Sequence, residues 1–101
     1  MMMSDTLRLH VKGEYFQAIK SGEKVFEYRQ RTPYWIKRIK DKPYIFVEII
    51  HGYPRKDDKD KRLLFSYRGY ELETIVHPHF GNTPQDVFAI HVNPSQSITK
   101  F

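Results

Sequence analysis

Apolar and polar residues alternate along much of this chain, and two short stretches instead show helical spacing. Residues 7–12 alternate apolar and basic side chains, which predicts a half-buried strand with its three apolar residues facing inward. Residues 14–21 place apolar side chains three to four positions apart, which predicts a short helix. Gly22 follows and is a good helix stop, because a residue without Cβ readily takes the left-handed conformation. A helix of about two turns is unstable alone, so we expect it to lie on a sheet.

The segment after this helix combines a strand pattern with charged residues. Val25, Glu27 and Arg29 share one face of the expected strand, and Phe26 and Tyr28 share the other. We expect this strand to lie at the centre of a small sheet. Burial of unpaired charges would be costly there, so the neighbouring glutamate and arginine need a structural or a functional explanation.

A second helix and four further strands complete the pattern. Thr32 is typical of a helix N-cap and Pro33 of a first turn, so a helix is predicted over residues 34–40. The expected core residues of this helix are Trp35, Ile36 and Ile39. Further strands are predicted at residues 44–50, 63–67, 70–76 and 87–92. The first of these four is almost continuously apolar, which indicates a central position.

The predicted fold class is α+β and mainly β, a PUA-like mixed β-barrel of about five to six strands flanked by two short helices. Gly69 lies between two strand patterns and marks the kind of bend that a closed barrel requires. The charged residues 55–62 are interpreted as a mobile hairpin loop, with a phosphate-contacting arm as the alternative. The domain is expected over residues 7–92, between a flexible N-terminus at 1–6 and a poorly ordered tail at 93–101.

Composition and charge narrow the choice of partner only slightly. The formal net charge of +5 favours an anionic partner, most often nucleic acid, although modest charge also keeps a small domain soluble. The absence of cysteine excludes disulfides, thiol chemistry and Cys-based zinc sites. No apolar run approaches membrane-spanning length, so we expect no membrane partner and a cytoplasmic location. No sequence feature indicates an obligate protein partner.

The motif Gly-x-Lys-x-x-Glu-x-Arg, at residues 22–29 directly after a short helix, resembles the signature of ASCH domains, a branch of the PUA-like RNA-binding folds. The surrounding sequence is also similar, at residues 15–22 before the motif and at 32–35 after it. Arg-Gly-Tyr at 68–70 and His-Pro-His-Phe-Gly at 77–81 follow in the family's order. The resemblance covers nearly the whole chain and implies a PUA-like pseudobarrel in which the motif lines a substrate or RNA cleft.

The motif supplies the candidate catalytic residues Lys24, Glu27 and Arg29. The planar fork of Arg29 suits a phosphate or a base carbonyl. Glu27 can orient Lys24, or accept a hydrogen bond from a base amino group or a ribose hydroxyl. Lys24, partly desolvated, would have a lowered pKa and could act as a base or proton donor. The alternative is an ion-pair cluster that fixes the helix–strand junction.

Aromatic and basic residues elsewhere suit stacking and phosphate contact. The candidate ligand-binding residues are Tyr28, Tyr34, Lys37, Arg38, Arg68, His77, His79 and Phe80. Phe80 would stack on a base. His77 and His79 could instead be a metal pair, but no third ligand lies near in sequence. We therefore expect no metal site and no cofactor, with a divalent metal left open.

These residues predict an RNA- or nucleotide-binding protein with a charged cleft, with weak ribonuclease activity as the catalytic expectation. Some ASCH proteins are linked to RNA cleavage, and others are amidohydrolases that deacetylate N4-acetylcytidine. The amidohydrolase set resembles a Lys, a Thr three residues later and a distant Glu. Lys24 matches the Lys, Glu27 occupies the Thr position, and Glu71 and Glu73 are the candidates for the distant Glu. A non-catalytic RNA- or nucleotide-sensing module is the third alternative.

Overall fold

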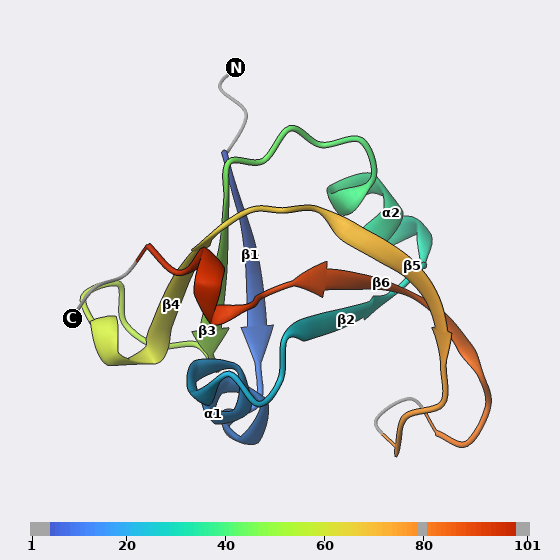
Figure 1. Cartoon of the computed structure of the whole chain (residues 1–101), viewed down its shortest axis with the longest axis horizontal. Coiled ribbons are helices and arrows are strands. Elements are labelled where there is room, and N and C mark those ends of the chain that lie inside the picture. The colour runs from blue at the N-terminus through green and yellow to red at the C-terminus, as the bar shows by residue number, and fades with distance from the viewer. Residues whose placement is uncertain (1–4, 79–80, 99–101) are drawn as a thin grey trace.

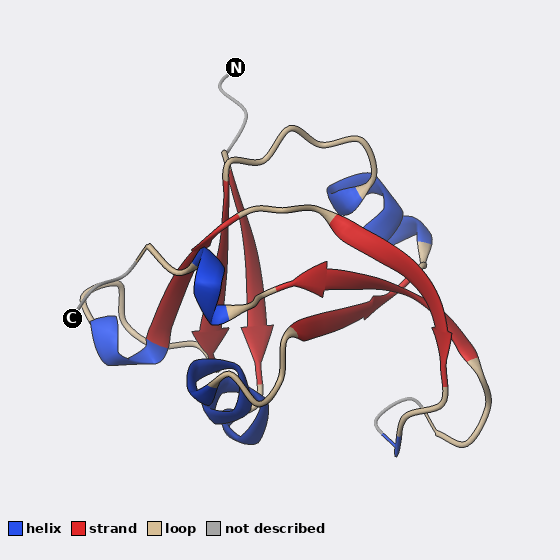
Figure 2. Ribbon diagram, viewed as in Figure 1, coloured by secondary structure: helices blue, strands red, loops and turns tan. Residues whose placement is uncertain are grey.

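A computed structural model describes residues 5–78 and 81–98, and in these residues it has six strands and two α-helices (Figures 1 and 2). In chain order they are β1 (Thr6–Val11), α1 (Gly13–Ser21), β2 (Phe26–Gln30), α2 (Pro33–Ile39), β3 (Phe46–His51), β4 (Arg62–Ser66), β5 (Tyr70–Ile75) and β6 (Gln85–His91). Short 3₁₀ helices lie at Lys59–Lys61 and Pro94–Gln96. The predicted class, α+β and mainly β, is confirmed.

The six strands form two three-stranded sheets. In sheet A the order is β1-β3-β4, with β1 parallel to β3 and β3 antiparallel to β4. In sheet B the order is β2-β6-β5, and both pairs are antiparallel. Figure 1 shows the strands of one sheet running across those of the other. Within the described residues the strands form two separate hydrogen-bonded sheets, and not one closed barrel.

The strand that carries the motif is β2, and it lies at an edge of sheet B. Our prediction of a central position for it was wrong, because β6 takes that place. Residues 87–90 of β6 are all buried, whereas β2 carries one buried residue, Glu27. A strand that is covered on both faces needs a continuous apolar run, and β6 has one. By the same rule β3 was predicted to be central, and in sheet A it is.

The core lies between the two sheets and α1. Leu7, Leu9 and Val11 of β1 face this core, as predicted. The other core residues are Phe16, Ile19, Ile39, Val47, Ile49, Phe65, Phe88, Ile90 and Val92. Ile36 was expected in the core but is 38% exposed, because the short helix α2 buries only Ile39. Ile45 was expected in a strand, but it precedes β3 and is 57% exposed.

Both helices have the ends that the sequence predicts. Gly22 follows α1 with φ 86°, and its N–H donates to the carbonyl of Ile19. The N–H of Lys24 then donates to the carbonyl of Ala18, which places this lysine directly under the helix end. Thr32 caps α2, because its side-chain oxygen accepts a hydrogen bond from the N–H of Trp35. The two caps hold the motif strand between two fixed helix ends.

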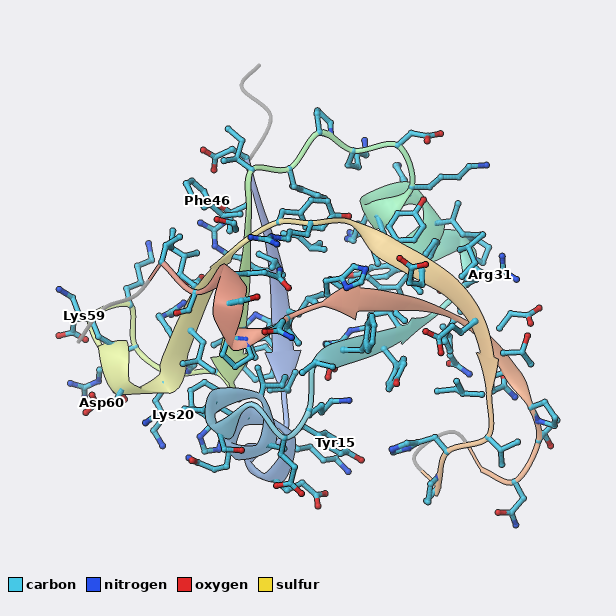
Figure 3. The ribbon with its side chains drawn as sticks, viewed as in Figure 1. Tyr15, Lys20, Arg31, Phe46, Lys59 and Asp60 are labelled. Carbon is cyan, nitrogen blue, oxygen red and sulfur yellow. The ribbon has the colours of Figure 1, made fainter. Side chains whose placement is uncertain are left out.

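The charged connection between β3 and β4 joins two antiparallel neighbours, as the predicted hairpin requires. It contains the 3₁₀ helix Lys59–Lys61. The side chains of Lys59 and Asp60 project outward from this turn (Figure 3). Arg62, which was placed at the end of the loop, is instead the first residue of β4.

The ordered structure extends past both boundaries predicted for the domain. β1 already begins at Thr6, and residues 94–96 form a capped 3₁₀ helix. Residues 93–98, which the sequence assigned to the tail, contact the rest of the domain. Gln96 is 3% exposed, and its amide donates to the carbonyls of Ser66 (2.9 Å) and His91 (3.0 Å). This amide ties the end of β4 in sheet A to the end of β6 in sheet B.

We predict that Gln96→Ala lowers the free energy of unfolding by about 1–3 kcal/mol, because two partly buried carbonyls lose their donor. Urea denaturation of the purified variants measures this difference. Gln17→Ala, at an exposed position of α1, is the matched control and should stay near wild type. An unchanged urea midpoint for Gln96→Ala would show that this segment does not hold the two sheets together.

Candidate functional site

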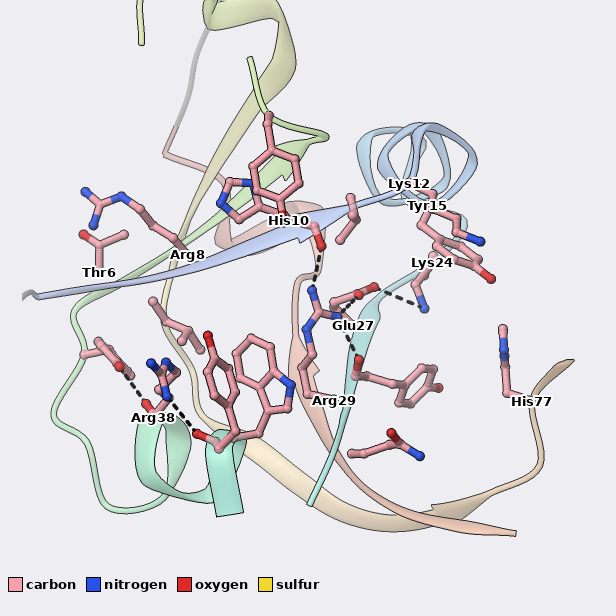
Figure 4. Close-up of a pocket in the computed structure, with 18 residues that line it drawn as sticks. Thr6, Arg8, His10, Lys12, Tyr15, Lys24, Glu27, Arg29, Arg38 and His77 are labelled. Atoms are coloured by element: carbon pink, nitrogen blue, oxygen red, sulfur yellow. Dashed lines mark hydrogen bonds and ion pairs between the residues drawn. The ribbon is translucent and has the colours of Figure 1, made fainter. Parts of the chain in front are cut away.

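A cleft of about 700 Å³ lies along the β1 edge of sheet A and the β2 edge of sheet B. Its walls are the side chains of β1, β2 and α2. Tyr15 from α1, Tyr53 after β3 and His77 after β5 complete the rim. Figure 4 shows that the side chains of Lys24, Glu27 and Arg29 lie side by side in the middle of this cleft.

Glu27 is the centre of the trio. It is 6% exposed, and its carboxylate lies between the Lys24 ammonium, 3.7 Å away, and the Arg29 guanidinium, with which it also forms a hydrogen-bonded ion pair. Glu27 and Arg29 share a strand face, as the two-residue spacing predicts, and Lys24 reaches them from the loop before β2. A buried carboxylate is stable only when cations and donors surround it, and here two cations do so.

Arg29 connects the two sheets. One terminal nitrogen donates to Glu27 and to the Tyr28 carbonyl (2.8 Å), and the other donates to the His10 carbonyl of β1 (2.8 Å). The guanidinium carbon lies 5.2 Å from the Trp35 ring centroid, within cation–π range. Both terminal nitrogens are thus engaged with protein acceptors. This geometry agrees with the alternative in which the arginine braces the structure, and it leaves the fork little capacity for phosphate.

Lys24 is the member of the trio best placed for chemistry. Its side chain is 18% exposed, and its ammonium lies 4.4 Å from the Tyr28 ring centroid and 5.6 Å from that of Tyr15. Burial lowers the pKa of Lys24, although the Glu27 carboxylate opposes the change. A lysine whose pKa is lowered in a cleft can exchange a proton more readily than one in water.

Tyr15 and Tyr28 lie next to Lys24 at one end of the cleft, and His77 lines the same cleft beside Tyr15. Burial raises the pKa of the Tyr15 and Tyr28 hydroxyls, and nearby carboxylates add to the change. Both hydroxyls therefore stay protonated at neutral pH and can donate hydrogen bonds. The His77 ring meets the edge of the Tyr15 ring, with centroids 6.0 Å apart. This end combines one cation of lowered pKa with two hydroxyl donors and an imidazole.

The other end of the cleft is aromatic and basic. Tyr34 is 55% exposed, and its ring lies 3.5 Å from the Arg38 guanidinium carbon and edge-on to Trp35, with centroids 5.0 Å apart. The Tyr44 hydroxyl donates to the carbonyl of Arg38 (2.6 Å) and fixes the end of α2. Exposed rings beside a guanidinium can stack on a flat ligand and contact its negative charge.

Most of the residues predicted to form the site meet in this cleft. They are Lys24, Glu27, Tyr28, Arg29, Tyr34, Arg38 and His77. Lys37 and Arg68, which were also predicted to bind the ligand, are exposed and do not line the cleft. Lys37 is one position from Arg38 on α2, which turns it about 100° away. Arg68 lies in the turn between β4 and β5. His79 and Phe80 lie outside the described residues.

The lining residues that sequence reasoning did not assign to the site include His10, Tyr15 and Tyr44. His10 stacks on Tyr53 with ring centroids 4.3 Å apart, and its Nδ1 lies 2.7 Å from the Gly52 carbonyl. The signal for His10 was present, because it belongs to the polar face of the alternating β1 segment. Helical spacing left Tyr15 and Phe16 as alternatives for the apolar face of α1, and nothing in that spacing distinguishes a core tyrosine from one at a cleft rim.

Among residues 5–78 and 81–98 no three His, Cys, Asp or Glu side chains lie close enough to hold a metal ion. His51 packs on Phe16, and His91 contacts Phe26 and Glu71, so these two histidines belong to different surroundings. None of the described helices has the length and apolar character needed to cross a membrane.

Comparison of the chain with protein-family models, with curated proteins and with solved structures finds no match. The resemblance to ASCH domains therefore stays a prediction that rests on the residues of the motif and their order.

We predict that Glu27→Gln lowers the pKa of Lys24 further, because the carboxylate is what raises it against the effect of burial. An NMR titration of the Lys24 side-chain Cε and Nζ measures the pKa directly. Glu23→Gln removes the same charge at an exposed neighbouring position and should leave the Lys24 pKa nearly unchanged. A Lys24 pKa that is unaltered or raised in Glu27→Gln would contradict the coupling.

Proposed function

We propose that this chain binds single-stranded RNA or a nucleotide in the cleft between β1 and β2. The observation that carries the proposal is the meeting of exposed aromatic rings and cations in one hollow of about 700 Å³. Rings that stack on bases and cations that contact phosphates are the two components of single-strand recognition. The formal net charge of +5 supports an anionic ligand.

The two ends of the cleft suit different parts of such a ligand. A base stacks on Tyr34 or Trp35, with Arg38 beside it to contact a phosphate. The sugar and the next phosphate lie toward Lys24, where the Tyr28 hydroxyl donates a hydrogen bond. Arg29 and Glu27 hold β1 and β2 at the separation that forms the cleft. Lys24 supplies the charge that faces the ligand.

We further propose that the two sheets are a PUA-like barrel that is open on its cleft side. On the opposite side the chain runs directly from β4 in sheet A to β5 in sheet B through Gly69, which has φ 81°. A bridge between Phe65 and Ser97 also links the two halves there. On the cleft side the β1 and β2 edges are joined through the Arg29 side chain. An RNA or nucleotide ligand makes the cytoplasm the expected location.

Ribonuclease activity is the second candidate function, and the lowered pKa of Lys24 favours it. In this reaction the neutral amine of Lys24 takes the proton of a ribose 2′-hydroxyl. The 2′-oxygen attacks the adjacent phosphorus, and the bond to the 5′-oxygen breaks. A tyrosine hydroxyl or protonated His77 gives a proton to the leaving 5′-oxygen.

The amidohydrolase alternative finds less support in the geometry. Glu27 occupies the position of the hydroxyl residue, and its carboxylate is buried between two cations. Glu71, a candidate for the distant glutamate, is paired with His91 at 3.0 Å. Neither Glu71 nor Glu73 lines the cleft. The non-catalytic binding module is the outcome if ligand binds and the chain does not cleave it.

We predict that Arg38→Gln weakens binding of a short oligouridylate and reduces the slope of log affinity against log salt by about 0.7, the value for one lost phosphate contact. Fluorescence anisotropy between about 50 mM and about 200 mM salt measures both quantities. Lys37→Gln is the matched control, because it removes the same charge from the same helix outside the cleft. An affinity that does not change with salt concentration, or an equal loss of affinity in both variants, would refute binding in the cleft.

We predict that Lys24→Arg reduces any RNA cleavage by about a hundred-fold to ten-thousand-fold, because arginine keeps the charge but does not release a proton at neutral pH. The wild-type rate should rise with pH as Lys24 loses its proton, and this rise should vanish in the variant. Lys20→Arg, on the exposed side of α1, is the control. Cleavage that survives Lys24→Arg would come from another site or a contaminant.

A further inference from the structure

Sheet A has a second hollow on its outer surface, beside the cleft. Its volume is about 550 Å³, and it is lined by Arg8, His10, Glu48, Ile50, Lys56 and Arg62. Arg8 and His10 also line the cleft, so the two hollows meet along the polar face of β1. A ligand that fills the cleft can therefore continue into the second hollow without leaving the protein surface.

Three neighbouring strands build this hollow through their register. Arg8 of β1 lies opposite Glu48 of β3, and Arg62 of β4 lies opposite Ile50 of β3. One oxygen of Glu48 lies 3.3 Å from Arg8 Nε and 3.3 Å from Arg62 Nη1. Ile50 is 1% exposed and forms an apolar floor. A single carboxylate thus holds two guanidinium groups at the rim.

The charges of the second hollow do not balance. Arg8, Lys56 and Arg62 bring three positive charges, against the one carboxylate of Glu48. Lys56 is exposed and makes no ion pair with any described residue. The surplus of positive charge favours an anion there.

The hydrogen bonds of Arg62 are long, which distinguishes it from Arg29. Its terminal nitrogens donate to Glu48 at 3.3 Å and to the Arg55 carbonyl at 3.5 Å. Its buried Nε has no hydrogen-bond partner among the described residues. In Arg29, by contrast, the contacts to backbone carbonyls are 2.8 Å. The terminal nitrogens of Arg62, whose contacts are long, therefore keep donor capacity that a phosphate can use, whereas the buried Nε is out of its reach.

We propose that this hollow is a second phosphate subsite, in which Lys56, Arg62 and Arg8 bind the backbone of the RNA strand whose base lies in the cleft. The proposal rests on the function proposed above. The stacked rings of His10 and Tyr53 lie where the bound RNA would cross β1, and Tyr53 is 87% exposed. These rings offer the crossing nucleotide a stacking surface between two phosphate contacts.

The test compares uridine 5′-monophosphate, which reaches the cleft alone, with an oligouridylate of about eight nucleotides, which is long enough to cover both hollows. Lys56→Gln should lower the affinity for the oligonucleotide roughly fivefold at about 0.1 M salt and reduce the salt slope by about 0.7. Its affinity for the mononucleotide should match wild type. Lys59→Gln, which removes a charge from the same loop outside the hollow, should leave both affinities unchanged.

The outcomes separate the two proposals. If the mononucleotide and the oligonucleotide both bind, but Lys56→Gln and Lys59→Gln weaken the oligonucleotide equally, the second subsite is refuted and the cleft stands. An oligonucleotide that binds no more tightly than the monophosphate also refutes the second subsite. If the wild-type protein binds neither ligand, the proposed function fails together with the subsite.

Discussion

A buried carboxylate must have positive charge close to it, and in this fold the carboxylate of Glu27 draws a cation from each side. Arg29 comes from the same strand and reaches across to the backbone of β1. Lys24 comes from the loop that follows α1. These contacts connect the edge of one sheet, the edge of the other and the end of a helix through a single acidic side chain. Removal of that carboxylate would leave two partly buried cations without their common partner.

The two cations differ in how easily they lose a proton, so they suit different roles. An arginine stays charged at any pH a protein meets, so it is a dependable brace. A lysine changes its pKa when it is desolvated, and burial lowers that of Lys24. The same carboxylate therefore pairs with an arginine that is always charged and with a lysine whose pKa is lowered by burial. This arrangement explains why an internal ion-pair cluster and a functional cleft are compatible interpretations of one motif.

The site also depends on β1 and β2 being edge strands. Edge strands expose backbone groups that invite pairing with other chains, and proteins commonly protect them with charged side chains. Here the polar face of β1 carries Arg8 and His10, and β2 carries Glu27 and Arg29. A side-chain bridge in place of a backbone ladder keeps the two edges apart, and the space between them becomes the cleft. The charged residues thus protect the edges and line the site.

The sequence by itself determined the local elements, the class of fold and the identity of the central trio. The alternation of apolar and polar residues, the helix end at Gly22 and the helix N-cap at Thr32 each depend only on residues close together in the chain. They can therefore be predicted from the sequence. Tertiary structure alone decided that β2 lies at an edge and that residues 93–98 tie the two sheets together. It also decided that Lys37 lies outside the cleft while His10 lines it. These features depend on which strands pair and which side chains meet across long stretches of chain. Local patterns carry no information about such contacts, because many pairings satisfy the same alternation of apolar and polar residues.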